Sequence, residues 1–451
     1  MTDQLLLNQL LTAHFAPVPL EELVVSRCDL PHWMRPDLQR ALDTLFANAD
    51  AHRFVGARMR GHDLDFCFAD LLESGSRAIA IGPVVWQEID IGEEARVRCV
   101  TRGLWLAERD GVRFALLVDV SEGYRHVRAR VEIAVAGGAE RETYAKRLLA
   151  ELRAGAESGA SWRGKVLVIE PPHDEFELAA AGPRVEKNAP VDRASIVLRE
   201  DKLALIERNT IGFAERAEQL AALGLSAKKG LLLYGPPGTG KTLIVRWLAG
   251  ALHGYTKLIV TAGHYGLLEE TLSIAKVLQP AMVVLEDVDL VAGDRGGPWA
   301  GPGHILNMLL NEMDGLPREA RVIFVLTTNR PEVLEPALAA RPGRVDQAVE
   351  IGLPDEPERR VLVERYAGGL IVRTDDAARL AQRVGRVSPA FIKELMRRAA
   401  QVMLDRGGGG TLEIGDMDAA LHDMLGSGGA TSARMLGMDK RRIGFTAEAI
   451  G

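Results

Sequence analysis

Eight consecutive residues, Gly235 to Thr242, have the types and spacing of a phosphate-binding loop. They fit G-x-x-x-x-G-K-[ST] and lie between an apolar run, 231–234, and a helical pattern that starts at Leu243. Glycines let the backbone turn its N–H groups toward phosphate oxygens, and the following helix adds the positive end of its dipole. Because every fixed position and both flanks agree, the stretch predicts binding of a nucleoside triphosphate. The predicted binding residues are Gly235, Pro236, Pro237, Gly238, Thr239, Gly240, Lys241 and Thr242.

Three further groups of polar residues could take part in the same chemistry. Glu286 and Asp287 end the apolar run 282–285, where carboxylates could hold Mg²⁺ and polarise water. Asn329 ends the next apolar run and could orient water beside the γ-phosphate. Arg341 and Arg344 are three residues apart in a turn, and arginines of this kind can neutralise transition-state charge. Acids at a strand end and arginines in a turn are often plain surface residues, so this interpretation depends on the phosphate-binding loop.

The elements that must position these residues alternate between strand and helix. The runs 257–260, 282–285 and 322–326 are apolar and β-branched, which is typical of strands buried on both faces of a parallel sheet. After Pro354 the pattern is helical to about residue 425, with a glycine-rich break at 407–410. We therefore predict an α/β module with a parallel sheet and a helical lid.

The N-terminal part has a different pattern and no chemical motif. Residues 1 to about 50 favour helices, several short β-rich runs follow from about residue 77, and a helix is predicted over 140–152. We predict an α+β domain that positions a partner or substrate. The predicted bounds are 1–170 for this domain, 171–194 for a linker, 195–353 for the large α/β subdomain, 354–425 for the lid and 426–451 for a C-terminal tail.

Composition narrows the class of protein. The 451 residues carry a net charge of −7, which disfavours a broad nucleic-acid-binding face. The three cysteines are widely spaced and the ten histidines show no metal-like spacing, which disfavours a disulfide framework or a structural zinc site. No run of eighteen apolar residues occurs, and the N-terminus lacks the features of a signal peptide. We expect a cytoplasmic protein without a membrane span.

Taken together, residues from about 200 to 425 resemble the AAA subfamily of the AAA+ ATPases. The blocks 230–242 and 338–346 carry this resemblance most specifically. It implies ATP and Mg²⁺ as ligands and a homo-oligomeric ring, usually a hexamer. It also implies that Asp314-Gly315-Leu316 is an intersubunit-signalling segment and that Ser388 and Ala390 lie at the turn that closes over the adenine.

The resemblance also implies catalytic roles. Lys241 would contact the phosphates, Thr242 and Glu286 would belong to the Mg²⁺ shell, and Asp287 would polarise water. Asn329 would be the sensor 1 residue, and Arg341 and Arg344 would be arginine fingers that act on the nucleotide of a neighbouring subunit.

Two departures from the family pattern affect these expectations. The family usually ends its acidic strand with Asp-Glu, whereas this chain has Glu286-Asp287, an order shared by members that translocate folded protein across the mitochondrial inner membrane. We expect hydrolysis, at a rate that the Asp287 side chain, which is one methylene shorter, could lower. The segment of the first pore loop is short and retains 263–266, with Tyr265. Trp299, within the glycine-rich stretch 296–303, is the alternative residue for contact with a client, and the other interpretation is that it packs against the neighbouring domain.

These observations favour an ATP-hydrolysing ring that remodels, disassembles or translocates a protein client recognised by the N-terminal domain. One alternative is a nucleotide-gated scaffold with little turnover. Another is a nucleic-acid motor or loader, although the acidic net charge and the block 341–344 argue against it.

Overall fold

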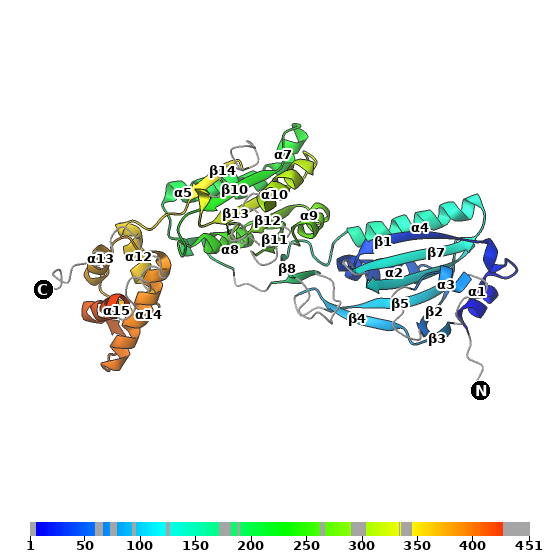
Figure 1. Ribbon diagram of the computed structural model, residues 1–451, viewed down its shortest axis with the longest axis horizontal. Helices are drawn as coiled ribbons and strands as arrows, with labels where there is room; N and C mark the ends of the chain where they lie inside the picture. The colour runs from blue at the N-terminus through cyan, green and yellow to red at the C-terminus, as the bar shows by residue number, and fades with distance from the viewer. Residues whose placement is uncertain are drawn as a thin grey trace. The chain divides into compact units, whose positions relative to one another are not determined.

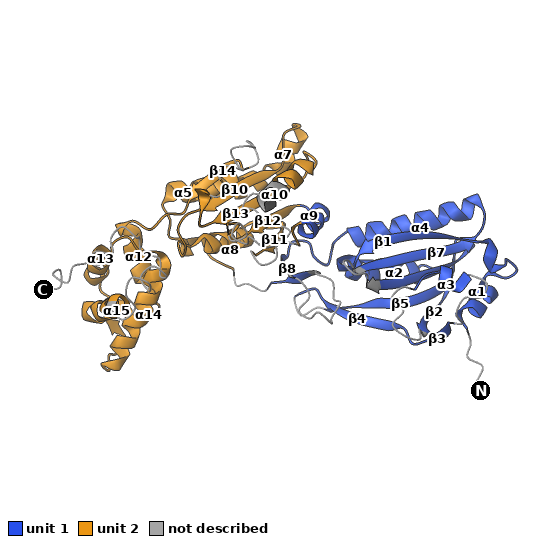
Figure 2. Ribbon diagram, viewed as in Figure 1, with its two compact units in different colours: residues 1–187, 269–279 blue, residues 188–268, 280–451 orange. Residues whose placement is uncertain are grey.

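The chain has two compact units, shown in different colours in Figure 2. One comprises residues 1–187 with 269–279, and the other comprises 188–268 with 280–451. The structure is a computed structural model that describes residues 6–58, 66–72, 79–92, 96–122, 127–170, 182–186, 190–261, 267–289, 304–332, 334 and 345–426.

The first unit is built on an antiparallel sheet with the strand order β1-β7-β6-β5-β2-β3, and β4 pairs with β5 (Figure 1). Strand β8 pairs antiparallel with β9. The strands are β1 (Leu23–Pro31), β2 (Ala51–Arg58), β3 (Ala80–Gly82), β4 (Val85–Asp90), β5 (Arg96–Arg109), β6 (Val112–Glu122), β7 (Val127–Ala136), β8 (Val166–Glu170) and β9 (Gly182–Val185). The helices are α1 (Leu7–Phe15), α2 (Arg35–Ala47), α3 (Ala69–Leu72), α4 (Ala139–Glu157) and α9 (Leu268–Val277), of which residues 269–277 belong to this unit.

Helices cover both faces of this sheet because its side chains alternate between two apolar sets. Helices α2 and α4 pack against each other on one face, where Phe46 of α2 stacks on Trp105 of β5 with ring centroids 5.1 Å apart. Helix α1 packs on the other face, where its Leu7 and Leu11 share a buried cluster with Leu104 and Leu117. The sheet is therefore the centre of a three-layer unit.

A row of alternating charges crosses four neighbouring strands on the α1 face. The register places Arg102 opposite Asp119, Asp119 opposite Arg130, and Arg130 opposite Asp29. Arg102 Nε lies 2.6 Å from Asp119 Oδ1, and Asp119 also accepts a hydrogen bond of 3.1 Å from the Phe66 N–H. Burial raises the pKa of the Asp119 carboxyl, although the bonds from Arg102 oppose this effect. Because opposite charges face each other in a single register, this row helps to specify the pairing of the sheet.

The prediction that residues 1 to about 50 form helices is wrong in part. Strand β1 occupies residues 23–31 and pairs with β7 along its whole length, from Leu23 opposite Ala136 to Pro31 opposite Arg128. Its sequence lacks a clean alternation of polar and apolar residues, so the strand is determined by pairing with a segment far along the chain. The predicted helix at 140–152 is confirmed as part of α4.

The second unit contains five parallel strands in the order β14-β10-β13-β12-β11 (Figure 1). Every residue of β11, β12 and β13 is buried, as the apolar, β-branched runs predict. The strands are β10 (Lys229–Tyr234), β11 (Thr256–Val260), β12 (Ala281–Leu285), β13 (Val322–Thr328) and β14 (Gln347–Glu350). The helices that accompany them are α5 (Glu200–Asn209), α6 (Ile211–Ala214), α7 (Ala217–Ala222), α8 (Lys241–Ala251) and α10 (His304–Gly315).

A helical lid follows β14 and has its own core. Asp355 and Glu358 form a capping box that starts the first lid helix, and the Ser388 side chain caps the third. Phe391, Ile392 and Leu395 belong to the buried cluster that joins the lid helices. The lid elements are α12 (Glu356–Tyr366), β15 (Ile371–Val372), α13 (Thr374–Arg383), α14 (Pro389–Asp405), β16 (Thr411–Leu412) and α15 (Ile414–Gly426). The predicted fold class, an α/β module with a lid after an α+β region, is confirmed.

Candidate nucleotide site

The loop from Gly235 to Gly240 connects the end of β10 to the start of α8 in a conformation that needs glycine. Gly235 has φ +146°, and a Cβ at this position would lie 2.2 Å from the Ile351 carbonyl oxygen. Gly240 has φ +100° and directly precedes Lys241, the first residue of α8. The loop therefore presents its backbone at the N-terminus of an eleven-residue helix, which is the arrangement that binds phosphate.

Lys241 is held inside this loop by three oxygen atoms. Its Nζ donates hydrogen bonds to the carbonyl oxygens of Gly235 at 2.8 Å and Pro236 at 2.9 Å, and to Asn329 Oδ1 at 2.8 Å. Burial lowers the pKa of the Lys241 ammonium, and the nearby carboxylates of Asp287 and Asp289 oppose that shift. A buried ammonium whose three hydrogen-bond acceptors are neutral is well suited to bind an incoming phosphate.

Asp287 and Asn329 meet at the carboxyl ends of neighbouring strands. Parallel pairing places Leu285 of β12 opposite Leu326 of β13, so the residues that follow both strands lie at one edge of the sheet. Asn329 Nδ2 donates a hydrogen bond of 3.0 Å to Asp287 Oδ1. Since Asn329 Oδ1 also accepts from Lys241, one amide connects the phosphate-binding lysine to the predicted catalytic acid.

The backbone at Asp287 is strained. Its φ of +53° lies in the left-handed region, which a residue with a side chain rarely adopts. Two hydrogen bonds help to hold this conformation: Asp287 N–H donates to Thr327 Oγ1 at 2.9 Å, and the Val288 N–H donates to the Thr327 carbonyl at 3.0 Å. Such strain at an acid beside Lys241 is consistent with a functional constraint on the direction of its carboxylate.

Asp289 is a residue of this site that the sequence analysis did not select. It is 4 % exposed, and its Oδ1 accepts hydrogen bonds from Thr328 Oγ1 at 2.8 Å and from the Asn329 N–H at 3.0 Å. Asp289 therefore fixes the end of β13 from which Asn329 projects. The sequence shows a third acid two positions after Asp287, but its role in holding the end of β13 becomes evident only from the pairing of β12 with β13.

The lid contacts the phosphate-binding loop through the start of α14. The Ala390 N–H donates a hydrogen bond of 3.2 Å to the Gly238 carbonyl, and a Cβ on Gly238 would lie 2.9 Å from the Ala390 Cβ. Ser388 is fully buried and accepts a hydrogen bond from the Phe391 N–H. The two residues predicted to lie over the adenine are thus beside the loop, and their contact with adenine stays a prediction.

The remaining predicted residues divide into two groups. Thr242 is exposed in the first turn of α8 and Glu286 is half-buried, next to Asp287. Their assignment to Mg²⁺ stays a prediction. Arg341 and Arg344 lie outside the described residues, as do Tyr265 and Trp299. The donor set fits a magnesium nucleotide, because a hydroxyl and carboxylates are oxygen ligands and the helix N-terminus with Lys241 suits phosphate.

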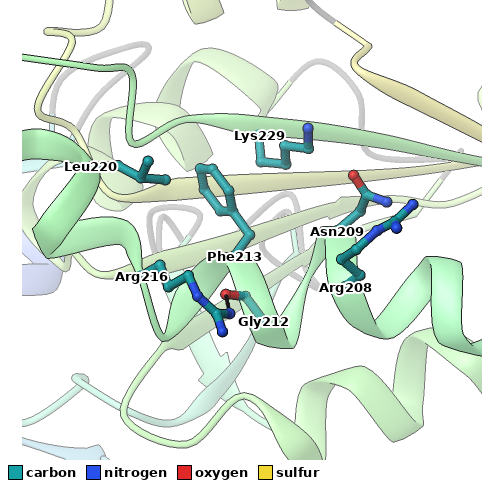
Figure 3. A pocket seen from close by; sticks show the side chains of 7 residues that line it. All are labelled: Arg208, Asn209, Gly212, Phe213, Arg216, Leu220 and Lys229. Atoms are coloured by element: carbon teal, nitrogen blue, oxygen red, sulfur yellow. Dashed lines mark hydrogen bonds between the residues drawn. The ribbon is translucent and has the colours of Figure 1, made fainter.

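A second concave feature of this unit lies away from the loop. It is a pocket of about 390 Å³, lined by Arg208, Arg216, Lys229 and Phe213 together with Asn209, Gly212 and Leu220 (Figure 3). Lys229 Nζ lies 5.8 Å from the centre of the Phe213 ring and 3.9 Å from an Asp346 oxygen. Lys229 is the first residue of β10, whereas the phosphate-binding loop follows the last residue of that strand. The pocket is therefore not part of the nucleotide site.

A phosphate-binding loop, a parallel sheet with acids at its carboxyl edge and a helical lid define a P-loop nucleoside triphosphatase. Residues 231–353 match the family model described as ATPase family associated with various cellular activities (AAA). This part of the chain is thus an AAA ATPase domain, as predicted, and its ligands are ATP and Mg²⁺.

Curated proteins to which the chain is similar include bacterial proteins named ATP-dependent zinc metalloprotease FtsH. FtsH 2 of Symbiobacterium thermophilum is 31 % identical over 275 residues, which cover 58 % of this chain and 46 % of the relative. FtsH of Mesoplasma florum is 32 % identical over 260 residues, which cover 55 % of this chain and 39 % of the relative. The chain thus matches less than half the length of each of these two relatives.

The names of these relatives refer to a zinc-dependent protease. The 451 residues contain no His-Glu-x-x-His sequence, the zinc-binding motif of many metalloproteases. Within the described ranges, no group of three or more His, Cys, Asp or Glu side chains could hold a metal ion. No helix in the described part of the chain is long and apolar enough to span a bilayer.

Proposed function

We propose that the chain is an ATP-hydrolysing subunit of a homo-oligomeric ring, usually hexameric in this family, that remodels a protein client bound by the first unit. The observation that carries the proposal is a pair of hydrogen bonds through Asn329, which connects Lys241 to Asp287. It brings a phosphate-binding cation, a water-orienting amide and an acid together at one edge of the sheet.

In this proposal each residue has a distinct task. Lys241 would bind the β- and γ-phosphates, and Thr242 and Glu286 would hold Mg²⁺, which would supply positive charge to the phosphate oxygens. Asp287 accepts a proton from the attacking water, and Asn329 keeps the water and the carboxylate aligned. The strained backbone of Asp287 supports this assignment, because it fixes the shorter side chain toward Asn329 and thereby toward Lys241.

The ring is proposed from the resemblance to the family. Arg341 and Arg344 would reach the nucleotide of the neighbouring subunit and neutralise charge in its transition state. Such an arrangement makes the isolated subunit incomplete for hydrolysis. Remodelling of a protein client is likewise proposed from this resemblance.

A nucleotide-gated scaffold with little turnover is the second candidate function. The shorter acid of the pair, Asp287, is already hydrogen-bonded to Asn329, which could reduce its availability to water. Under this alternative, ATP binding alone would switch the ring between two states. The measured turnover separates this candidate from the first one.

The test is ATP turnover by the unaltered chain and by Asp287→Asn, with ATP binding measured in parallel. We expect turnover in the unaltered chain, loss of turnover in Asp287→Asn, and equal ATP affinity in both. A chain that binds ATP but does not hydrolyse it would support the scaffold. Stimulation by DNA but not by protein would refute the proposed class of client. A pull-down with Asp287→Asn, which should retain its client, would then identify it.

A further inference from the structure

The pocket between α5, α6, α7 and the start of β10 lies within the second unit, at a sharp break between two helices (Figure 3). Thr210 separates α5 from α6, with φ −123° and ψ −77°. It is fully buried, and its Oγ1 donates a hydrogen bond of 2.7 Å to the Ile206 carbonyl. The break therefore has a fixed geometry, in which Arg208 before it and Phe213 after it line the same pocket.

Three of the seven lining side chains are cationic and none is acidic. Two of these cations, Arg208 and Arg216, are exposed to solvent. Arg216 Nη1 donates a hydrogen bond of 2.9 Å to the Gly212 carbonyl, which holds its guanidinium beside the pocket and leaves most of its five N–H donors for a ligand. Within the described ranges, no Asp or Glu side chain pairs with Arg208 or Arg216. The two guanidinium groups are therefore suited to bind an anion from outside the chain.

Positive charge exceeds negative charge around the pocket. Lys229, the third cation, has Asp346 close by, with Oδ2 at 3.9 Å from its Nζ. Glu207 is next to Arg208 in the chain but pairs with Arg193, whose Nε lies 2.5 Å from Glu207 Oε1. An unbalanced cluster of cations in a concave surface attracts anions. A phosphate monoester fits this excess of charge, because it carries about −1.5 to −2 at pH 7.

An apolar part accompanies these charges. Phe213 is half-buried, and Lys229 Nζ lies 5.8 Å from the centre of its ring. In the view of Figure 3, Phe213 lies between Leu220 on one side and Arg208 with Asn209 on the other. An aromatic ring in a ligand could stack on Phe213 in an offset geometry. The volume of about 390 Å³ lies within the range of about 300–1,000 Å³ that is typical of pockets for small molecules.

We propose that this pocket binds a small phosphate monoester that carries an aromatic ring. Arg208, Arg216 and Lys229 bind the phosphate, and Phe213 with Leu220 contacts the ring. The site is separate from the proposed hydrolysis of ATP and does not depend on it, because the pocket is at the first residue of β10 and the phosphate-binding loop follows the last. The limited volume favours a small molecule over an acidic segment of another protein.

The first experiment titrates the full chain with phenyl phosphate in a calorimeter. Inorganic phosphate and phenol are the matched probes, since each has one half of the proposed ligand. We expect saturable binding of phenyl phosphate, about tenfold tighter than that of inorganic phosphate, because only the monoester adds a ring contact. Lys241→Ala identifies any binding at the phosphate-binding loop, and we expect this variant to retain the affinity of the unaltered chain for phenyl phosphate.

Substitutions in the pocket assign the binding to its residues. Arg208→Ala and Arg216→Ala should each weaken phenyl phosphate binding on the order of tenfold, since each removes a charge-assisted hydrogen bond. Arg216→Lys should recover part of the affinity. The control is Arg199→Ala, because Arg199 precedes α5, pairs with Asp201 at 2.8 Å and does not line the pocket. Phe213→Leu should weaken the binding of phenyl phosphate and leave that of inorganic phosphate unchanged.

Asp346→Asn should change the affinity in the opposite direction. The substitution removes the carboxylate near Lys229, and asparagine retains an oxygen that can accept the hydrogen bond of 2.8 Å from the Gly230 N–H. We expect phenyl phosphate to bind about twofold to fivefold more tightly, as for the loss of one partly exposed ion-pair partner. A gain of affinity of this kind cannot result from a folding defect.

Four outcomes would overturn the proposal. They are no saturable binding up to ~10 mM phenyl phosphate, binding that Lys241→Ala abolishes, equal effects of Arg216→Ala and Arg199→Ala, and weaker binding in Asp346→Asn. Binding of a polyglutamate peptide by a chain that does not bind phenyl phosphate would also overturn it, in favour of an acidic protein partner. None of these measurements needs ATP hydrolysis, so failure of the proposed function would leave the result unaffected.

Discussion

Asp289 provides a prediction whose size can be derived from its hydrogen bonds. Asp289→Ala leaves two donors without their acceptor, the Thr328 hydroxyl and the Asn329 N–H. Thr328 is fully buried, so water cannot replace the lost oxygen at that hydroxyl. Each unsatisfied buried donor costs about 1–3 kcal/mol, so Asp289→Ala should destabilise the second unit by about 2–6 kcal/mol.

Asp289→Asn should destabilise the second unit less than Asp289→Ala does. A single oxygen, Oδ1, accepts both hydrogen bonds, and asparagine retains an oxygen that can take this position. What is lost is the charge on the acceptor, which reduces each bond from about 1.5–3 kcal/mol to about 1 kcal/mol. For the two bonds together we therefore expect a loss of about 1–4 kcal/mol. The ratio of the losses of unfolding free energy in Asp289→Ala and Asp289→Asn is a better test than either loss alone.

Scanning calorimetry measures these differences. The transition of the second unit is the one that moves to higher temperature when ATP is added, because a ligand stabilises the unit that binds it. For a unit of this size, each kcal/mol lowers Tm by about 2–4 °C. Turnover should fall further than ATP affinity in Asp289→Ala, since Asn329 loses its backbone anchor while Lys241 keeps two carbonyl partners.

A buried acid elsewhere in the same unit is the control. Asp416 in the lid is 4 % exposed and accepts hydrogen bonds from Arg406 at 2.6 Å and 2.8 Å. Asp416→Ala should lower Tm and leave turnover unchanged. Equal losses of stability in Asp289→Asn and Asp289→Ala would refute the reasoning about unsatisfied donors. Unchanged turnover in Asp289→Ala would refute the role of Asp289 in holding Asn329.

Three other predictions concern binding, the ring and pH. Lys241→Ala should abolish ATP binding in titration calorimetry, and near-normal affinity would contradict the role of its ammonium. Arg344→Ala should lower turnover by ~10³-fold but leave binding intact. Mixing Arg344→Ala with Lys241→Ala subunits should restore some activity, and no recovery in confirmed mixed rings would count against fingers that act between subunits. Hydrogen bonds from Arg397 and Arg398 lower the pKa of Glu394 from 4.5 to about 2. Its stabilisation, at most about 1 kcal/mol for a partly exposed group, is present above pH 4.5 and lost as pH falls toward 2. Glu394→Gln should therefore lower Tm at pH 7 but not at pH 2, and an equal change at both would contradict this.

Much of the second unit could be predicted because its signals are local. The predicted runs 257–260, 282–285 and 322–326 coincide with β11, β12 and β13 within two residues at each end. Parallel strands that are buried on both faces appear in the sequence as continuous runs of apolar and β-branched residues. The same fact explains why Asn329 and Asp287 lie within hydrogen-bond distance, since the carboxyl ends of such strands share one edge of the sheet.

Features that depend on distant pairing could not be predicted in this way. Strand β1 is determined by its pairing with β7. Asp289 can accept hydrogen bonds from residues 328 and 329 only because β12 lies beside β13. The contact of Arg163 with the end of α9 joins residues more than a hundred positions apart. No local spacing identifies such an arginine, because an isolated Arg in a loop is usually a solvated surface residue.

The interleaving of the two units has a consequence for the order in which the protein is made. Helix α9 belongs with the first unit, yet its residues follow the phosphate-binding loop in the chain. During synthesis the loop 158–165 therefore emerges long before the helix that it binds, and β10, α8 and β11 emerge between them. Domains usually fold as they leave the ribosome, starting from the N-terminus. Here the first unit gains its last helix only after the nucleotide-binding loop has been translated, so a gene fragment that stops at residue 187 would encode an N-terminal unit without α9.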